Sequence, residues 1–372
     1  MKKNNNSKRQ GKRKTVKKSG TTTARATIGI DLGDQKSHYC ILDAEGEVLS
    51  EGTVRTTESG FAQQFQRMAR SRIVLETGTH SLWVSRLLER YGHEVIVANT
   101  RHVRAIYDND NKTDKVDARM LARLARVDKR LLHPVRHRTA QAQADLVLLK
   151  ARDQLVSIRT QLINSVRGMV KSVGGRLPSS SSAYFAKKVP EHLPDAVREA
   201  LLPLLEQIEA ITAQITAYDK KIEHLCRTKY PKTQLIRQIP SVGSLTSLAF
   251  VLTIDDPYRF QKSRTVGSYL GLRPRRDDSG ASSPQLPITK AGDHFMWRLL
   301  INCAQHVLGR FGTDTDLRRW GLSLMERGGK NARKRAVVAV ARKLAVMMHS
   351  LWSTGEVYEP LRQANKFNTI AA

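Results

Sequence analysis

The feature that most constrains the fold is the hydrophobic period of residues 26–98. Three alternating stretches come first, TIGID, HYCILD and EVLSEGTVRT, and the turn signal Ala44-Glu45-Gly46 separates the last two. A helical pattern over 59–70 follows, and then two short apolar runs, RIVLE and EVIVAN, with helical spacing over 81–91 between them. Three antiparallel strands followed by strand–helix–strand predict an α/β domain, a mixed sheet with helices on its faces.

A different period, typical of long paired helices, covers residues 145–226. Apolar residues recur at spacings of three and four in two segments that flank the break GGRLPSSSS. The first segment comprises Leu148, Ala151, Leu155, Ile158, Leu162, Ser165 and Met169, and the second comprises Leu201, Leu204, Ile208, Ile211, Ile215, Tyr218, Ile222 and Leu225. This pattern predicts long helices with coiled-coil seams, packed on each other or on another subunit. Two ordinary core helices are the alternative.

The last part of the chain is predicted to be mainly α-helical. LIRQIPSVGSLTSLAFVL resembles a helix-hairpin-helix, whose hairpin at 239–243 would suit a phosphate. A polar loop rich in Ser, Gly, Pro and Arg follows, and then helices over 294–308 and 332–351. We therefore expect a basic arm (1–25), a mixed-sheet domain (26–140), a coiled-coil region (141–229), a second domain (230–355) and a tail (356–372).

The charge of the chain indicates a polyanionic partner. Lys and Arg total 63 against 34 Asp and Glu, a formal net charge of +29, which is typical of proteins that bind nucleic acid. Ten of the basic residues and no acidic ones lie in residues 1–25, so this arm is expected to be disordered in isolation and is a candidate nucleic-acid contact.

The cysteines and the hydropathy indicate the cellular environment in which the protein is expected to work. Cys40, Cys226 and Cys303 are far apart, so they have no metal-ligand spacing and imply no disulfide framework. There is no apolar run of about 18 residues that would predict a membrane span. A reducing cytoplasm, in association with the nucleoid, fits these observations.

Four acidic residues stand where they could share a metal site. Asp31 ends the first strand, and Glu76 ends a buried strand that could lie beside it. Asp114 and Asp117 are three apart in KTDKVDARMLARLA, which places both on one face of a predicted helix. Four carboxylates at one spot would repel each other unless cations neutralised them. Mg²⁺ binds carboxylate oxygens, and two such ions can clamp the attacking and leaving oxygens of a phosphodiester.

Asp31 could instead hold a metal-nucleotide, as in actin-like ATPases. That role requires a second Asp-x-Gly loop after a later strand. The one further candidate, Asp278-Ser279-Gly280, follows RPRRD rather than an apolar strand, which weakens the ATPase interpretation.

Several ordered motifs resemble one known family. GIDLGDQKSHYCILD, VLETGTHSLWVSRLLERYGHEVIVANTRHVRAI and KTDKVDARMLARL resemble the RuvC-like DEDD domain of the IS110 family of insertion-sequence transposases, including its IS1111 group. IPSVGSLTSLAFVL, GSYLGLRPRRDDSG and ITKAGDHFMWRLLINCAQ resemble the second conserved domain of that family. The resemblance runs from about residue 26 to residue 352, and it implies an RNase H-like fold for the sheet domain.

The resemblance also implies catalytic roles. Asp31, Glu76, Asp114 and Asp117 match the DEDD acids, and Ser279 matches the serine nucleophile of the Ser-Gly signature. Ala281 stands where a second glycine is common, and Ser282 and Ser283 are near enough to leave the choice of serine open. A metal held by the acids could activate the hydroxyl, and the product would be a phosphoserine linkage to DNA.

The implied partners are donor and target DNA, a structured non-coding bridge RNA that pairs with both, and further copies of the chain. The coiled-coil helices would build the oligomer, a tetramer of dimer pairs. Two groups of basic residues are candidate phosphate contacts, one beside the serine loop and one at the start of the last helix. They are Arg275, Arg276 and Lys290, and Lys330, Arg333 and Lys334.

Four functions follow from these patterns. The first is an RNA-guided DNA transposase that uses Mg²⁺ and a covalent serine intermediate. The second is a RuvC-like structure-specific endonuclease, such as a junction resolvase, which would need the four acids but not Ser279. The others are a non-catalytic nucleic-acid-binding protein and an ATPase of related fold.

Overall fold

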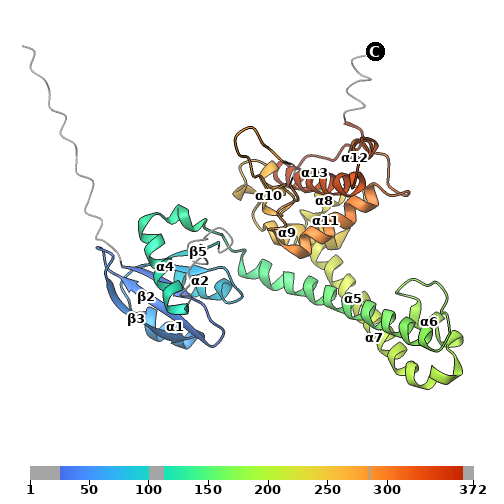
Figure 1. Ribbon diagram of the computed structural model, residues 1–372, viewed down its shortest axis with the longest axis horizontal. Coiled ribbons are helices and arrows are strands. Elements are labelled where there is room, and N and C mark those ends of the chain that lie inside the picture. The colour runs from blue at the N-terminus through green and yellow to red at the C-terminus, as the bar shows by residue number, and fades with distance from the viewer. Residues whose placement is uncertain (1–25, 100–112, 285, 363–372) are drawn as a thin grey trace, which may run out of the picture. The chain divides into compact units, whose positions relative to one another are not determined.

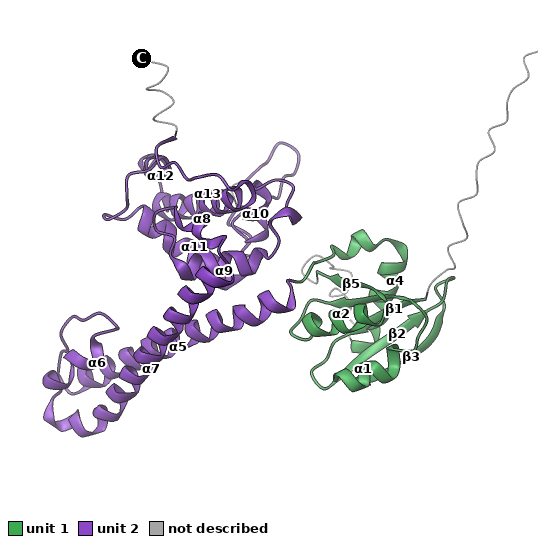
Figure 2. Cartoon of the chain, turned by 180° about the vertical axis from the view of Figure 1, so that it is seen from behind, with its two compact units in different colours: residues 1–137 green, residues 138–372 purple. Residues whose placement is uncertain are grey.

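The computed structural model describes residues 26–99, 113–284 and 286–362. The chain forms two compact units, unit 1 over residues 1–137 and unit 2 over residues 138–372 (Figures 1 and 2). The predicted basic arm lies outside the described residues. Among the helices that are described, none has the length and apolar character needed to cross a membrane.

Unit 1 is built around a five-stranded sheet in the order β3-β2-β1-β4-β5. The outer and central strands β3, β2 and β1 are antiparallel, whereas β1, β4 and β5 are parallel, which confirms the predicted mixed sheet. Its elements are β1 (Thr27–Asp31), β2 (Lys36–Leu42), β3 (Val48–Arg55), α1 (Glu58–Phe65), β4 (Arg72–Glu76), α2 (Ser81–Arg90), β5 (Glu94–Ala98), α4 (Asp114–Val127) and the 3₁₀ helix η2 (Lys129–Leu132).

Alternation of side chains along the strands creates two different packing faces. Ile28 and Ile30 lie on the face that packs with Phe61 and Phe65 of α1, and this face holds the larger apolar cluster of the unit. The opposite face is covered by α4, which contacts β1, β2 and β4. Small residues allow that helix to come close to the sheet, and two of them, Ala118 and Ala122, pack with Cys40 and Leu42.

Gly29 sets the distance between α4 and the centre of the sheet. A Cβ atom at this position would lie 1.9 Å from the Ala118 carbonyl oxygen and 2.6 Å from the Ala122 nitrogen. Only glycine therefore permits this approach of helix backbone to strand backbone. The contact holds the start of α4 over β1, two residues before Asp31.

The described part of unit 2 is mainly helical, with a short hairpin between α10 and α11. Its elements are α5 (Ala140–Ser172), α6 (Phe185–Lys188), η3 (Pro190–His192), α7 (Asp195–Thr228), α8 (Thr233–Arg237), α9 (Ser244–Ile254), η4 (Pro257–Arg259), α10 (Arg264–Tyr269), α11 (His294–Val307), α12 (Asp316–Glu326) and α13 (Ala332–Thr354). The predicted helices over 294–308 and 332–351 correspond to α11 and α13, whereas α12 was not predicted.

Helices α5 and α7 pack against each other as an antiparallel pair. Asp145 receives a hydrogen bond from Lys229, and farther along the pair Arg152 binds Asp219, so residue numbers rise on one helix as they fall on the other. The α7 heptad largely matches the buried positions, which include Ile208, Ile215 and Ile222.

The predicted heptad positions of α5 are wrong in its second half. Ser165 and Met169 are exposed there, and Val166 and Val170 are buried instead. Val166 and Val170 share a core with Phe185 and Val189 of the segment between the long helices, so that segment determines which face of α5 is covered there.

The break between the two long helices is a folded cap rather than a plain linker. Phe185, Val189 and Leu193 from this segment are buried against the far ends of α5 and α7. We call residues 164–194 the tip. Figure 1 shows it at the end of the helical pair remote from the other helices of unit 2.

The near end of the pair is part of a second and larger core. Leu146 and Leu149 of α5 and Ile222 of α7 share one apolar cluster with α9, α11 and α13. The predicted boundary at residues 229 and 230 therefore separates segments that share a core.

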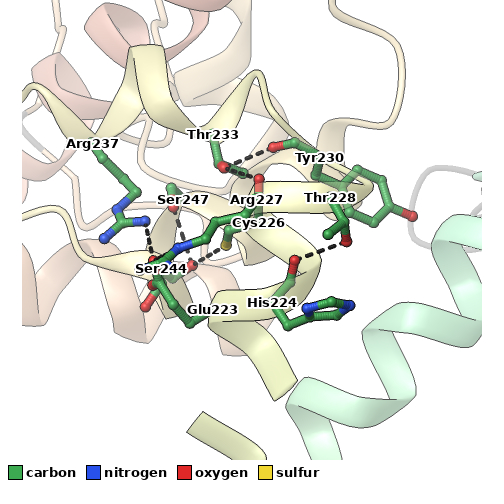
Figure 3. A network of polar contacts seen from close by, with 10 residues as sticks. All are labelled: Glu223, His224, Cys226, Arg227, Thr228, Tyr230, Thr233, Arg237, Ser244 and Ser247. Carbon is green, nitrogen blue, oxygen red and sulfur yellow. Dashed lines mark hydrogen bonds and ion pairs between the residues drawn. The ribbon is translucent and has the colours of Figure 1, made fainter. Parts of the chain in front are cut away.

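Polar contacts reinforce the junction between α7 and the helices that follow it (Figure 3). Glu223 accepts hydrogen bonds from Arg227 and Arg237, and these hold its carboxyl pKa below the ordinary value, with the bond from Arg237 the main cause. The Thr233 hydroxyl donates to the Cys226 carbonyl oxygen, which ties α8 to the last turns of α7.

Candidate functional site

Asp31 and Glu76 leave the sheet of unit 1 side by side. Asp31 is the last residue of β1, and Glu76 is the last residue of β4. The two strands are parallel, and their last paired residues are Ile30 and Leu75. Because Gly29 faces α4 and side chains alternate, Asp31 faces α4, and the strand register gives Glu76 the same orientation.

Helix α4 adds the other two acids. Thr113 is its N-cap and accepts a hydrogen bond from the Val116 amide at 3.3 Å, and Asp114 and Asp117 occupy the first turn. Asp117 is only 6% exposed, whereas the Asp114 side chain is 68% exposed. Burial of a carboxylate costs free energy unless it is hydrogen-bonded or paired with a cation, so Asp117 is the more constrained of the two.

His38 shows which end of the sheet the start of α4 approaches. It lies directly opposite Asp31 in β2, and its Nε2 is 3.7 Å from Asp114 Oδ2. We did not single out His38 from the sequence. Its position opposite Asp31 in an alternating strand is the signal that could have identified it. Unit 1 has a second histidine that contacts an acid: the Nε2 atom of His80 is 3.3 Å from the Oδ1 atom of Asp34.

The four predicted acids are thus placed at one end of the sheet, on the face that α4 covers. Their chemistry fits Mg²⁺, which prefers carboxylate oxygens. In the described part of the chain, however, no three His, Cys, Asp or Glu side chains are arranged as a set that could hold a metal ion. The backbone positions of the acids converge, but their side chains do not form a closed ligand set.

Ser279 lies at the turn of an exposed hairpin in unit 2. Its amide donates to the Ser282 carbonyl oxygen at 3.1 Å, and the Ser282 amide donates back at 3.0 Å. Gly280 has a φ of +53°, and glycine with positive φ at the first central position is typical of a type II′ hairpin turn. The turn presents the Ser279 hydroxyl to solvent.

The neighbouring serines differ in their surroundings. Ser283 donates its hydroxyl hydrogen to Asp278 Oδ1 at 2.7 Å, so its hydroxyl is already engaged. Ser282 lies across the turn from Ser279 and is also exposed. The strands of the hairpin are joined by backbone bonds from Arg275 to Pro287 and from Thr289 to Arg273.

Both the segment that contains the acids and the segment that contains Ser279 match models of known protein families. A family model for the DEDD transposase domain of IS110, described as a transposase, matches residues 28–174. A second model, described as the transposase IS116/IS110/IS902 family, matches residues 233–320. The first segment contains all four predicted acids, and the second contains Ser279. The chain belongs to the IS110 family of insertion-sequence transposases.

Individual proteins are similar to this chain over most of its length. The transposase for insertion sequence element IS1111A of Coxiella burnetii is 28% identical, over 89% of this chain and 90% of its own length. The transposase for IS1328 of Yersinia enterocolitica is 25% identical, over 89% of this chain and 98% of its own. The pilin gene-inverting protein of Moraxella bovis is 24% identical, over 87% and 94%.

The predicted phosphate contacts of the transposase occupy two surfaces. Arg275 and Arg276 are exposed on the strand that leads to Ser279, and Lys290 is exposed where the hairpin returns to its base. Lys290 has a φ of +51°, and its amide donates to the Gly271 carbonyl oxygen at 3.1 Å. Lys330, Arg333 and Lys334 are exposed around the start of α13, beyond the second matched segment.

The helix-hairpin-helix predicted from the sequence corresponds to α8, a tight turn and α9. Ser241, in the turn, has a φ of +76°, and its hydroxyl lies 2.9 Å from His306 Nδ1 of α11. Gly243 caps α9 without a side-chain hydrogen bond. The turn and α11 border a hollow of about 520 Å³, which is lined by Ser241, Gly243, Thr246, Asn302 and His306 among others.

Proposed function

We propose that this transposase cuts and rejoins DNA through Ser279, together with a divalent metal held by Asp31, Glu76, Asp114 and Asp117. The observation that carries the proposal is the strand register that places Asp31 beside Glu76 under the first turn of α4. Asp31, Glu76 and the buried Asp117 carry like charges on neighbouring elements, and a bound cation would lower their mutual repulsion.

The acids would hold the metal, and Mg²⁺ or a pair of Mg²⁺ ions is the proposed cofactor. When bound, such an ion supplies a positive charge that polarises the phosphate and stabilises the charge that develops on its oxygens. Helix α4 positions Asp114 and Asp117, and Gly29 keeps that helix close enough to the strands for all four acids to share one site.

Ser279 would supply the nucleophile. Its Oγ attacks the phosphorus of the scissile phosphodiester and forms a new P–O bond, while the bond from that phosphorus to the sugar oxygen of the leaving DNA strand breaks. The proton of the serine hydroxyl is lost to solvent, and the leaving sugar oxygen takes up a proton. The covalent phosphoserine linkage retains the phosphodiester for attack by the hydroxyl of another strand. Arg275 and Arg276, which precede the turn, would hold nonbridging phosphate oxygens.

The proposed partners are donor and target DNA and a bridge RNA that chooses both by base pairing. A formal charge of +29 supports this, because it suits a protein that holds two kinds of nucleic acid by their backbones. The antiparallel pair of α5 and α7 would take part in building a homo-oligomer, which we propose to be a tetramer of dimer pairs.

A recombination assay with purified protein, RNA and paired DNA sites tests the proposal. We expect Ser279→Ala to abolish covalent protein–DNA adducts and recombinant product while DNA binding is retained. Ser282→Ala and Ser283→Ala are matched controls within the same hairpin, and both should keep activity. Asp31→Asn should also abolish product, because it weakens the metal site.

The same set of variants separates the competing functions. Continued recombination by Ser279→Ala would show that the serine assignment is wrong. If Ser279→Ala still cuts branched DNA while Asp31→Asn does not, the chain is a metal-dependent endonuclease without a covalent intermediate. Full activity of Asp31→Asn would refute the metal site.

A further inference from the structure

The tip of the α5–α7 pair carries a polar hollow for which the proposed reaction gives no role. The hollow measures about 540 Å³ and is lined by Ser179, Ser180, Ser181, Tyr184, Lys187 and Lys188. It falls between the two segments that the transposase family models match, residues 28–174 and 233–320.

Side chains of α5 and α6 contact the loop that forms the hollow. Arg167 of α5 donates to the Pro178 carbonyl oxygen at 3.2 Å, and its guanidinium lies 5.0 Å from the centre of the Phe185 ring. Lys188 donates to the Ser179 carbonyl oxygen at 3.0 Å. With Phe185 fully buried beneath it, this serine-rich loop has a fixed shape although its composition is that of a linker.

The side chains around the hollow suit a ligand that has an anionic group next to a planar ring. The tip contains five Lys or Arg and a single acidic residue, Glu191. Ser179, Ser181, Lys187 and Lys188 are exposed and can donate hydrogen bonds to a ligand. Ser180 is half-buried, and its hydroxyl donates to the Ser181 carbonyl oxygen at 3.0 Å. Tyr184 is 67% exposed and lies next to the buried Phe185, so its ring is available to a ligand at the tip.

We infer that the tip binds a single-stranded segment of nucleic acid. Lys187, Lys188 and the serine hydroxyls contact backbone phosphates, and an unpaired base stacks on Tyr184. Exposed aromatic rings flanked by cations are the usual platform for unpaired bases, because every base has a face that can stack. A duplex would offer the phosphates but not the base, so the ring favours a single strand.

This inference rests on the proposed function only in assuming that the chain binds nucleic acid. It does not involve Ser279 or the acids of unit 1. A binding experiment therefore tests it without reference to recombination, and the Ser279→Ala experiment can fail or succeed independently.

Photocrosslinking of the full-length protein gives a readout confined to the tip. The probes are single strands of DNA and of RNA, each about 16 nucleotides long and carrying a 4-thio pyrimidine. We expect crosslinks in the tryptic peptide 177–187, and a duplex of the same sequence should crosslink there poorly. The DNA and RNA arms show which of the two strands the tip prefers.

Variants identify the side chains responsible. Tyr184→Ala should lower the crosslink yield and weaken strand binding roughly 5- to 150-fold, whereas Tyr184→Phe should retain both. The double variant Lys187→Ala/Lys188→Ala loses two tryptic sites, so its crosslinks are measured in peptide 177–198. It should lower the slope of log Kd against log salt concentration by about 1.4. Lys187→Ala alone repeats the test and leaves the hydrogen bond from Lys188 to Ser179 in place.

Lys220→Ala/Lys221→Ala is the matched control. It removes the same charge from an adjacent exposed pair on α7, near the other end of the helical pair. Crosslinks that map only elsewhere would overturn the inference, as would equal crosslinking of the duplex. So would tip variants that behave no differently from this control while their melting temperatures match that of the unaltered protein.

Discussion

Replacement of Gly29 by alanine tests whether the acids of unit 1 depend on the position of α4. The added Cβ would lie 1.9 Å from the Ala118 carbonyl oxygen, whereas real Cβ atoms essentially never come within 3.0 Å of such an atom. Both sides of the contact are backbone, so no side chain can rotate away. Helix and strand must therefore separate by about 1 Å, and Asp114 and Asp117 move with the helix.

The expected size of the effect follows from that displacement. Overpacking costs about 1–3 kcal/mol, and alanine in a strand recovers only about 0.5–1 kcal/mol of glycine's excess entropy. We expect a net loss of about 1–2 kcal/mol in the free energy of unfolding. A displacement of about 1 Å between groups that must act together lowers the rate on the order of 100-fold.

Urea unfolding and Mg²⁺-dependent recombination measure these two effects. Gly78→Ala is the matched control, because it makes the same chemical change two residues after Glu76, where an added Cβ meets nothing within 4 Å. The control should have unaltered stability and activity. Gly29→Ala protein as stable and as active as the control would refute the claim that close packing of α4 assembles the acids.

Two further predictions concern titratable groups. Burial of Asp145 acts to raise its carboxyl pKa, but hydrogen bonds from Lys229 and Tyr230 outweigh it and hold the pKa low. Its stabilising contribution should therefore be complete above about pH 5 and be lost as the pH falls below the unfolded value of about 3.9. Unfolding curves of Asp145→Asn should lack this loss, and an identical acid dependence would contradict the reasoning. Burial raises the pKa of the Cys40 thiol to about 11. Iodoacetamide at pH 8 should therefore modify Cys40 about 100-fold more slowly in the native protein than in urea, because less of the thiol is ionised. Equal rates of modification would show that this thiol is not enclosed.

The sheet of unit 1 was predictable because its signals are local. Alternation around Ile28 and Ile30, and the short run that ends at Glu76, identify strands without knowledge of their neighbours. The ends of those strands also locate Asp31 and Glu76. The close contact at Gly29 was not predictable, because it depends on Ala118, far along the chain. The contact of His38 with Asp114 was not predictable for the same reason, although the strand pairing could have placed His38 opposite Asp31.

Unit 2 shows the limits of composition and of strict heptads. The segment GGRLPSSSS is predicted as a break because serine, proline and glycine dominate it. Phe185 and Val189, which follow it, nevertheless form a core with the long helices. Helix α12 buries Leu317 and Gly321 and was not predicted from the sequence. Ser279 stands in an exposed turn without any periodic pattern, and its proposed role comes only from family resemblance.

The most direct test of the account is to identify the residue that carries DNA in the covalent intermediate. Protein trapped during recombination can be digested with nuclease and trypsin, and fragmentation of peptide 277–290 locates the phosphate. The account predicts a phosphate on Ser279, and none in Asp31→Asn protein. A phosphate on Ser282 or Ser283, or no covalent intermediate in a fully active reaction, would contradict it.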